Sequence, residues 1–150
     1  MTAQVPEHLS YQGQNLRLFS EPLYSWLARR RNKHIRFKRR NTANGRGYSG
    51  HWEIIEDRLY LVSIRGTFSD GRDVTLGDLF PESPARVFAN WVNGEILCPM
   101  GKILGYSHSG YSSIYENSLF LRFELGVLVG QRTVKNEPPV PDEFDLMEDD

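Results

Sequence analysis

Alternating apolar and polar side chains run through the middle of the chain and predict β-strands. Residues 47–64 contain two runs rich in β-branched, aromatic and leucine side chains, and Glu56 and Asp57 lie between them. Such runs on both sides of a short polar turn are typical of a β-hairpin. Both faces of the second run are largely apolar, which favours a strand that is covered on both sides. We therefore predict that the fold is organised around this hairpin.

A shorter version of the same pattern returns at residues 110–121. Residues 54–61 align with residues 114–121 without a gap, and a Gly-Tyr-Ser sequence precedes each segment. Two explanations are open: an ancient duplication with two equivalent sites, or the general likeness of hairpin sequences. Both explanations predict a second hairpin, with its turn at Glu116 and Asn117.

Two further hairpins are predicted towards the C-terminus. The Asn-Gly pair at 93–94 lies between the apolar runs 86–91 and 95–99. Asn-Gly between two such runs is a strong indication of a tight hairpin turn. A last hairpin is predicted with its turn at 125–126.

Helical features are short. Residues 22–30 are predicted to form a helix, because Ser20 can cap it and Pro22 suits its first turn. Three apolar side chains follow at helical spacing: Leu23, Trp26 and Leu27. Residues 75–80 are predicted to form one helical turn that ends at Pro81.

The pattern as a whole gives roughly eight to ten short strands and one short N-terminal helix. Residues 1–19 are polar and rich in turn formers, and they are predicted to contribute one weak strand. We therefore predict a mainly β protein, an antiparallel β-sandwich or a small barrel built from hairpins. Residues 1–136 form this single domain, and residues 137–150, which are acidic and contain proline, form a flexible tail.

The composition narrows the class of protein further. No apolar run approaches the roughly 18 residues that span a bilayer as a helix. The N-terminus lacks the basic and apolar regions of a secretory signal, so a cytoplasmic protein is predicted. Cys98 is the single cysteine, which excludes an internal disulfide, and its apolar neighbours favour a small buried residue over a nucleophile.

Charge is separated along the chain, although the net charge is only −1. Residues 29–40, the basic segment, carry eight cations and no acid. These cations are Arg29, Arg30, Arg31, Lys33, Arg36, Lys38, Arg39 and Arg40. Residues 137–150, the acidic tail, carry seven acids and no lysine or arginine. This separation indicates contact with another large molecule.

The basic segment has three interpretations. Ile35 and Phe37 alternate with polar residues in 34–38, which predicts a half-buried strand that turns its cations outward. Such a strip can follow a nucleic-acid backbone. It can also dock an acidic protein or the chain's own acidic tail, or it can be merely solvated. The isoelectric point of about 6.4 counts against a dedicated nucleic-acid binder.

The acidic tail carries three large apolar side chains among its acids: Phe144, Leu146 and Met147. Acidic-apolar peptides of this kind fold onto basic grooves of partner proteins. The alternative is a tail that only increases solubility.

The sequence contains no convincing catalytic constellation. Four histidines are scattered without metal-ligand spacing: His8, His34, His51 and His108. Ser107 beside His108 lacks the context of a nucleophile. Glu53 together with Trp52 or Trp91 could bind sugar, although tryptophans in a small β protein are typical core residues. We predict no catalytic residue, no metal and no cofactor.

An ordered set of residues, covering roughly 47–130, resembles small β-rich bacterial proteins of immunity-protein type. The set is Gly47-Tyr48-x-Gly50-x-Trp52-Glu53-Ile54, Leu59-Tyr60-Leu61, Leu79-Phe80, Val87-Phe88-Ala89-x-Trp91, Gly94-Glu95-Ile96, Pro99-x-Gly101 and Tyr115-Glu116. The resemblance implies a protein that binds and blocks a partner toxin, and it implies no catalytic residue. The leading prediction is thus a non-enzymatic protein-binding module. The alternatives are a nucleic-acid-associated protein and a carbohydrate-binding or sugar-active protein.

Overall fold

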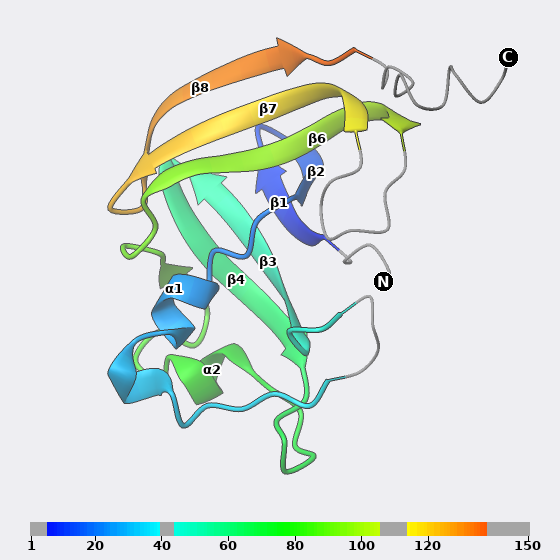
Figure 1. The fold of residues 1–150 in the computed structure, drawn as a ribbon. Coiled ribbons are helices and arrows are strands. Elements are labelled where there is room, and N and C mark those ends of the chain that lie inside the picture. Colours follow the sequence, from blue (N-terminus) through cyan, green and yellow to red (C-terminus); the bar gives the residue numbers. More distant parts are fainter. Residues whose placement is uncertain (1–5, 40–43, 106–113, 138–150) are drawn as a thin grey trace, which may run out of the picture.

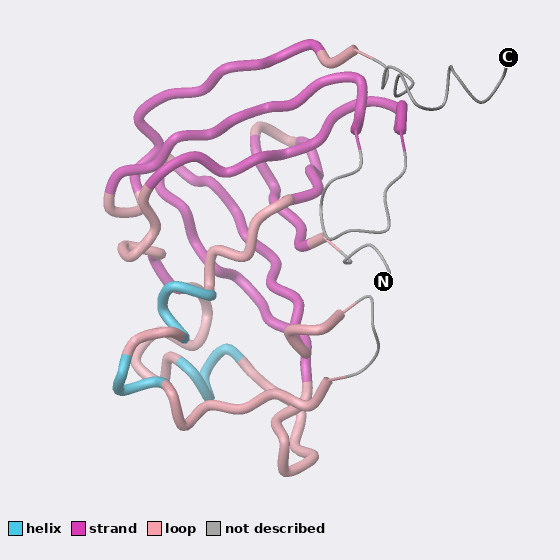
Figure 2. The backbone as a smooth tube through the Cα atoms, in the orientation of Figure 1, coloured by secondary structure: helices cyan, strands magenta, loops and turns pink. Residues whose placement is uncertain are grey.

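The structure of the protein, a computed structural model, describes residues 6–39, 44–105 and 114–137. In chain order the elements are β1 (Glu7–Tyr11), β2 (Gln14–Leu18), α1 (Tyr24–Leu27), the 3₁₀ helix η1 (Arg30–Asn32), β3 (Tyr48–Ile55), β4 (Arg58–Gly66), α2 (Leu76–Leu79), β5 (Val87–Phe88), β6 (Gly94–Gly105), β7 (Ile114–Glu124) and β8 (Val127–Lys135). Strands fill the upper part of the molecule, whereas the helices and most loops gather at its lower end (Figure 2).

The strands form one strongly bent sheet in the order β2-β1-β3-β4-β8-β7-β6, with β5 attached to β4. The pairing of β4 with β8 is confined to Arg58 and Val127, so the sheet opens there into two layers (Figure 1). On the far side the N–H of Phe19, just after β2, donates to the C=O of Leu97 in β6 at 2.7 Å. The predicted mainly β class is confirmed, and the sheet is sandwich-like because it does not close into a barrel. The pairing is mixed, since β1 runs parallel to β3.

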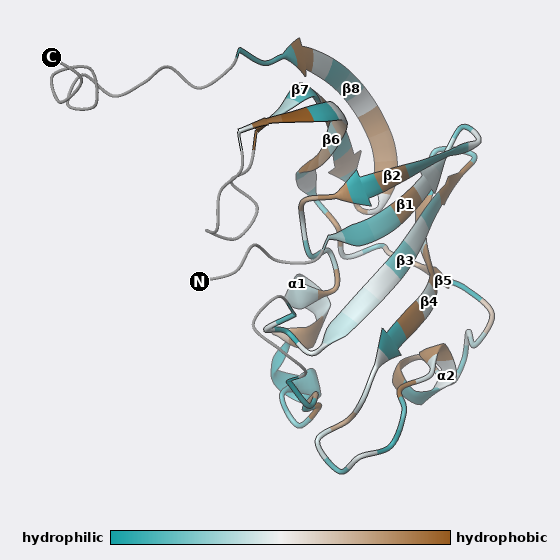
Figure 3. Ribbon diagram, turned by 90° about the vertical axis from the view of Figure 1, so that its right-hand side faces the viewer, coloured by the Kyte–Doolittle hydropathy of each residue, from teal (hydrophilic) through white to brown (hydrophobic). Residues whose placement is uncertain are grey.

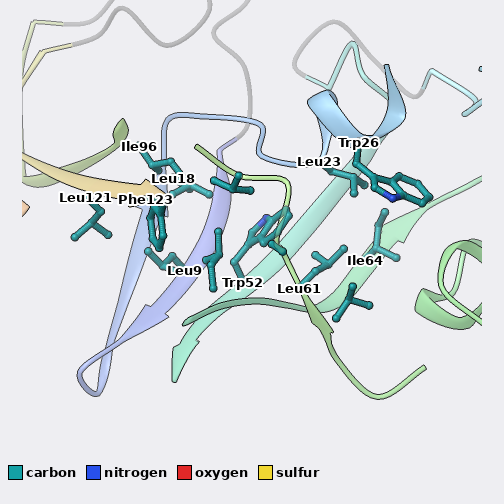
Figure 4. Close-up of a cluster of buried hydrophobic side chains, with 14 of the residues drawn as sticks. Leu9, Leu18, Leu23, Trp26, Trp52, Leu61, Ile64, Ile96, Leu121 and Phe123 are labelled. Carbon is teal, nitrogen blue, oxygen red and sulfur yellow. The ribbon is translucent and has the colours of Figure 1, made fainter. Parts of the chain in front are cut away.

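The core lies between the two layers. Strand β4, in which buried positions alternate with more exposed ones, directs apolar side chains towards the core (Figure 3). Leu9, Trp52 and Leu61 enter from the lower layer, and Leu121 and Phe123 enter from the upper layer (Figure 4). Burying each such side chain contributes about 1.5–3 kcal/mol, so this contact between layers stabilises the fold.

Two predicted hairpins are confirmed. Glu56 and Asp57, with φ of 50° and 62°, form the turn between β3 and β4. Leu125 and Gly126, with φ of 49° and 80°, form the turn between β7 and β8. Two positive φ values in a two-residue loop define the turn type whose twist matches that of the flanking strands.

The two other hairpin predictions are wrong. Glu116 and Asn117 lie inside β7, which is a continuous strand, because β6 and β8 pair with it on both sides. The run that precedes Asn93 pairs with β4 instead of β6. The Asn93 side chain instead accepts a hydrogen bond from the N–H of Leu125 at 2.8 Å, so this bend supports the β7–β8 turn.

The N-terminal region contains more strand than the sequence predicted. β1 and β2 form a hairpin whose turn is Gln12-Gly13, with φ of 51° and 74°. β1 also lies beside β3, with Leu9 opposite Trp52. The apolar positions Leu9, Leu16 and Leu18 are buried by this arrangement, which local pattern alone did not indicate.

The helix predicted over 22–30 is shorter than expected. α1 is followed by Arg29 in an extended conformation, with φ −62° and ψ 141°, so the arginines that follow belong to η1. The turn predicted at 75–80 is confirmed as α2, where Thr75 and Asp78 cap the helix reciprocally. In the described part of the chain, no helix has the length and apolarity that crossing a membrane requires.

Candidate partner-binding surface

The basic segment is attached firmly to the body while its cations face solvent. The strand predicted at 34–38 is reduced to one bridge between Phe37 and Phe68, but Ile35 and Phe37 do pack against the core as predicted. The backbone is held by hydrogen bonds from Lys38 N–H to Thr67 C=O at 2.7 Å and from Ser69 N–H to Arg36 C=O at 2.9 Å. The segment is therefore a fixed surface rather than a free arm.

The cations of the basic segment were predicted to face solvent. Seven of the eight lie in the described residues, and all seven are exposed: Arg29, Arg30, Arg31, Lys33, Arg36, Lys38 and Arg39. Arg40 lies outside the described residues. Within the described ranges, the ion pairs use the basic residues Arg46, Arg72 and Arg132, and none of these belongs to the basic segment. Among the described residues, these seven charges are exposed and are not neutralised by an ion pair.

A hollow of about 500 Å³ lies beside this segment. Its lining, here called the apolar hollow, combines six largely apolar residues with three cations. They are Tyr24, Leu27, Ala28, Ile35, Phe37 and Tyr48, together with Lys33, Arg36 and Arg46. The rings of Phe37 and Tyr48 are 4.9 Å apart and form part of the lining. A partner segment with a carboxylate next to an apolar side chain fits this lining, because the carboxylate can pair with a cation while the apolar side chain contacts the apolar residues.

Arg46 connects the apolar hollow to a buried carboxylate. Its Nε lies 3.3 Å from Glu7 Oε2 and 3.4 Å from Glu21 Oε1, and its guanidinium lies 5.6 Å from the centre of the Tyr48 ring. The arginine side chain is only 8% exposed, and it forms part of the lining of the hollow. Two acids and one aromatic ring therefore fix a cation at the boundary of the hollow.

Glu7 is the strongest feature that the sequence analysis missed. It is fully buried, and its Oε1 accepts hydrogen bonds from Gly50 N–H at 3.0 Å and from the indole N–H of Trp52 at 2.8 Å. Burial raises the pKa of Glu7 to about 7, although the Trp52 hydrogen bond, the charge of Arg46 and the Gly50 amide all oppose that shift. The sequence contains one indication of this burial: Glu7 lies two residues before Leu9, and in a strand side chains two residues apart point to the same face.

A second hollow of about 500 Å³ lies on the other side of Arg36, next to the 69–72 turn. It also contains Asp70, Asp78 and Arg72. The backbone amide and then the side chain of Arg72 hold the pKa of Asp70 below its usual value. Mixed charge makes this hollow less attractive to an anion than the apolar hollow.

A serine and a histidine meet on the outer face of the sheet. Ser10 Oγ lies 3.1 Å from His51 Nε2, and the Ser10 hydroxyl donates to Asn15 Oδ1 at 3.2 Å. The tautomer of His51 decides which of the two groups donates in this contact. The contact joins the neighbouring strands β1 and β3, and among the described residues no carboxylate is seen to orient the His51 ring as in a catalytic triad. Ser107 and His108 lie outside the described residues.

The structure brings together two of the residues considered for sugar binding, since the rings of Trp52 and Trp91 lie 6.5 Å apart, but it does not add Glu53 to them. Trp52 is fully buried, and Glu53 projects from the opposite face of β3. The indole N–H of Trp91 donates to the C=O of Pro22 at 2.8 Å, which makes it a packing residue. Burial also raises the pKa of the Cys98 thiol to about 12, so this cysteine is the inert buried residue that was predicted.

Phe144, Leu146 and Met147 of the acidic tail lie outside the described residues. Comparisons with protein-family models, with curated proteins and with solved structures found no match for the chain. The function must therefore be argued from the basic segment and the apolar hollow alone.

Proposed function

We propose that the protein is a non-enzymatic protein-binding module, of the kind that immunity or inhibitor proteins represent. Its basic segment and its apolar hollow hold an acidic, partly apolar segment of a partner protein, such as a toxin. The observation that carries the proposal is the position of the hollow beside seven exposed cations of the same segment.

Two interactions, charge attraction and the burial of apolar surface, support a protein partner. The cations attract and orient an acidic segment over long range, which raises the association rate. Apolar side chains that enter the hollow then contribute about 25 cal/mol for each Å² removed from water. A partner segment with both acidic and apolar side chains therefore associates faster and binds more tightly than one with acidic side chains alone.

Nucleic acid is the second candidate, and Tyr24 favours it. This tyrosine lines the hollow, is 68% exposed and could stack on an unpaired base next to the cations. Against this candidate, the other hollow beside Arg36 contains Asp70 and Asp78, which repel a phosphate backbone.

A binding assay with two probes separates the candidates. The first probe is a labelled synthetic peptide with the sequence of residues 141–150, and the second is a single-stranded ten-nucleotide DNA. We expect the full chain to bind the peptide more tightly than the DNA at about 0.15 M salt, because the apolar contacts are not screened. Tighter binding of the DNA, with a steep salt dependence, would replace the proposal by the second candidate.

Charge reversal tests the location of the site. We expect Arg36→Glu combined with Lys38→Glu to weaken peptide binding by about tenfold or more, the equivalent of about 1.4 kcal/mol. The matched control reverses two exposed cations of the upper layer, Lys102→Glu and Arg122→Glu, with the same change in net charge. Equal losses in both variants would show that only net charge matters and that the surface is not a site.

A further inference from the structure

Strand β8 has one paired edge and one open edge. On one side it pairs with β7 from Val127 to Lys135. On the other side its pairing with β4 is confined to the bridge between Arg58 and Val127. Figure 1 shows β8 as the outermost strand of the upper layer. Among the described residues, no strand lies along 129–135 on this side.

The backbone groups at the open edge can be assigned from one hydrogen bond. The N–H of Asn136, directly after β8, donates to the C=O of Glu116 in β7 at 2.9 Å. The backbone groups of successive strand residues point to opposite sides. Those of Lys135, Thr133 and Gln131 therefore point away from β7, and each of these residues presents one donor and one acceptor at the open edge.

Strand β6, on the other side of β7 in the upper layer, does not offer such an edge at Leu97 and Pro99. In β6, Pro99 has no N–H, and the C=O of Leu97 accepts the hydrogen bond from Phe19. β8 contains no proline, and its Val129 and Val134 side chains are 41% and 37% exposed. An open edge with exposed valines is a surface that pairs with another strand.

We infer that two copies of the protein pair through the open edges of β8, antiparallel, with Thr133 opposite Thr133 of the second copy. In this register Gln131 of each copy lies opposite Lys135 of the other, and all of these residues direct their backbone groups to the interface. Each of the three pairs exchanges two hydrogen bonds, which gives about six across the interface. Because the two identical edges occupy each other about a two-fold axis, this pairing closes at the dimer.

Two alternative registers towards the start of β8 are less favourable. Centring the two-fold axis on Arg132 places two guanidinium groups directly opposite each other, which is destabilising. Centring it on Gln131 brings Lys135 to Val127, whose edge already pairs with Arg58 of β4. In the register centred on Thr133, Arg132 lies opposite Val134, and its charge is already paired with Glu95 at 3.0 Å in the same copy.

Sedimentation of the full chain over a range of concentrations tests the dimer. The contact is small, so we expect a dissociation constant on the order of 10 μM. Thr133→Pro removes one outward N–H from each copy and should raise this constant by about tenfold or more, without breaking a bond to β7. The matched control, Thr133→Val, keeps the N–H and should leave the constant within about twofold.

Cysteine cross-linking tests the register and does not depend on the behaviour of the proline variant. Paired residues of antiparallel strands have Cα atoms about 5.5 Å apart, which a disulfide can bridge. Thr133→Cys should therefore form a covalent dimer on mild oxidation, and Gln131→Cys should form far less. Cys98 is buried and does not compete. A chain that sediments as a monomer at about 1 mM, or equal cross-linking of both variants, would overturn the inference.

Discussion

Trp52 donates its indole N–H to a carboxylate oxygen of Glu7 across 2.8 Å, in a part of the core where both side chains are fully buried. This bond joins β1 to β3 and accompanies the parallel pair of the sheet. A buried carboxylate is costly unless it is paired and hydrogen-bonded. Gly50 and Arg46 supply the remaining partners, so the N-terminal hairpin is locked to the central hairpin by a polar contact inside an apolar core.

Gly50 makes room for this contact. A Cβ atom at this position would lie 2.5 Å from Glu7 Oε1 and 2.8 Å from Trp52 Nε1. We expect Gly50→Ala to lower the free energy of unfolding by roughly 1–3 kcal/mol, because the added methyl group displaces the hydrogen-bonded carboxylate. Urea denaturation measures this loss. Gly130→Ala is the control, since a Cβ there meets nothing within 4 Å, and a loss of the same size in both variants would contradict the explanation.

Glu7 should also make stability depend on pH. Burial raises its folded-state pKa from 4.5 to about 7, so the native state binds more protons than the unfolded state between these values. The stability that the protonated form provides is complete below about pH 4.5 and is lost as the pH rises through 7. The expected loss from this group is about 3 kcal/mol, because one pKa unit corresponds to about 1.4 kcal/mol.

The variant Glu7→Gln isolates this contribution. A glutamine does not titrate, so the difference in unfolding free energy between the variant and the wild type should move by about 3 kcal/mol in favour of the variant from pH 5 to pH 8. Chemical denaturation at several pH values gives this difference. A difference that stays constant over this range would show that Glu7 is not buried as described.

The turn between β3 and β4 can be improved. Glu56 and Asp57 adopt φ of 50° and 62°, a conformation that asparagine and glycine accept at lower cost. We expect Glu56→Asn combined with Asp57→Gly to raise the free energy of unfolding by about 1 kcal/mol. A shift of the urea midpoint to higher concentration, with an unchanged slope, would confirm it. No shift would mean that the turn is not the one described.

The elements that the sequence predicts correctly are those determined by neighbouring residues in the chain. The β3–β4 and β7–β8 turns were found because short polar or glycine-containing sequences separate two apolar runs. Glu116 and Asn117 were misassigned because their local resemblance to a turn is outweighed by pairing with β6 and β8 on both sides. Glu7 could not be found, since its partners Trp52 and Arg46 are distant in sequence.

The same distinction applies to the candidate site. The cations of the basic segment were visible as a composition feature, and the structure places the described ones in solvent. The apolar hollow was not predictable, because it combines Tyr24 and Leu27 near α1 with Tyr48 at the start of β3. Only the fold brings an apolar surface next to these cations.

The most direct test of the proposed function is a titration of the ¹⁵N-labelled full chain with the unlabelled peptide of residues 141–150, followed by NMR. We expect the amide signals that shift most to belong to residues 24–28 and 33–38, around the apolar hollow. We also expect the variant carrying Arg36→Glu and Lys38→Glu to lose these shifts. Shifts that cluster on another surface such as β8, or that persist unchanged in this variant, would contradict the proposed function.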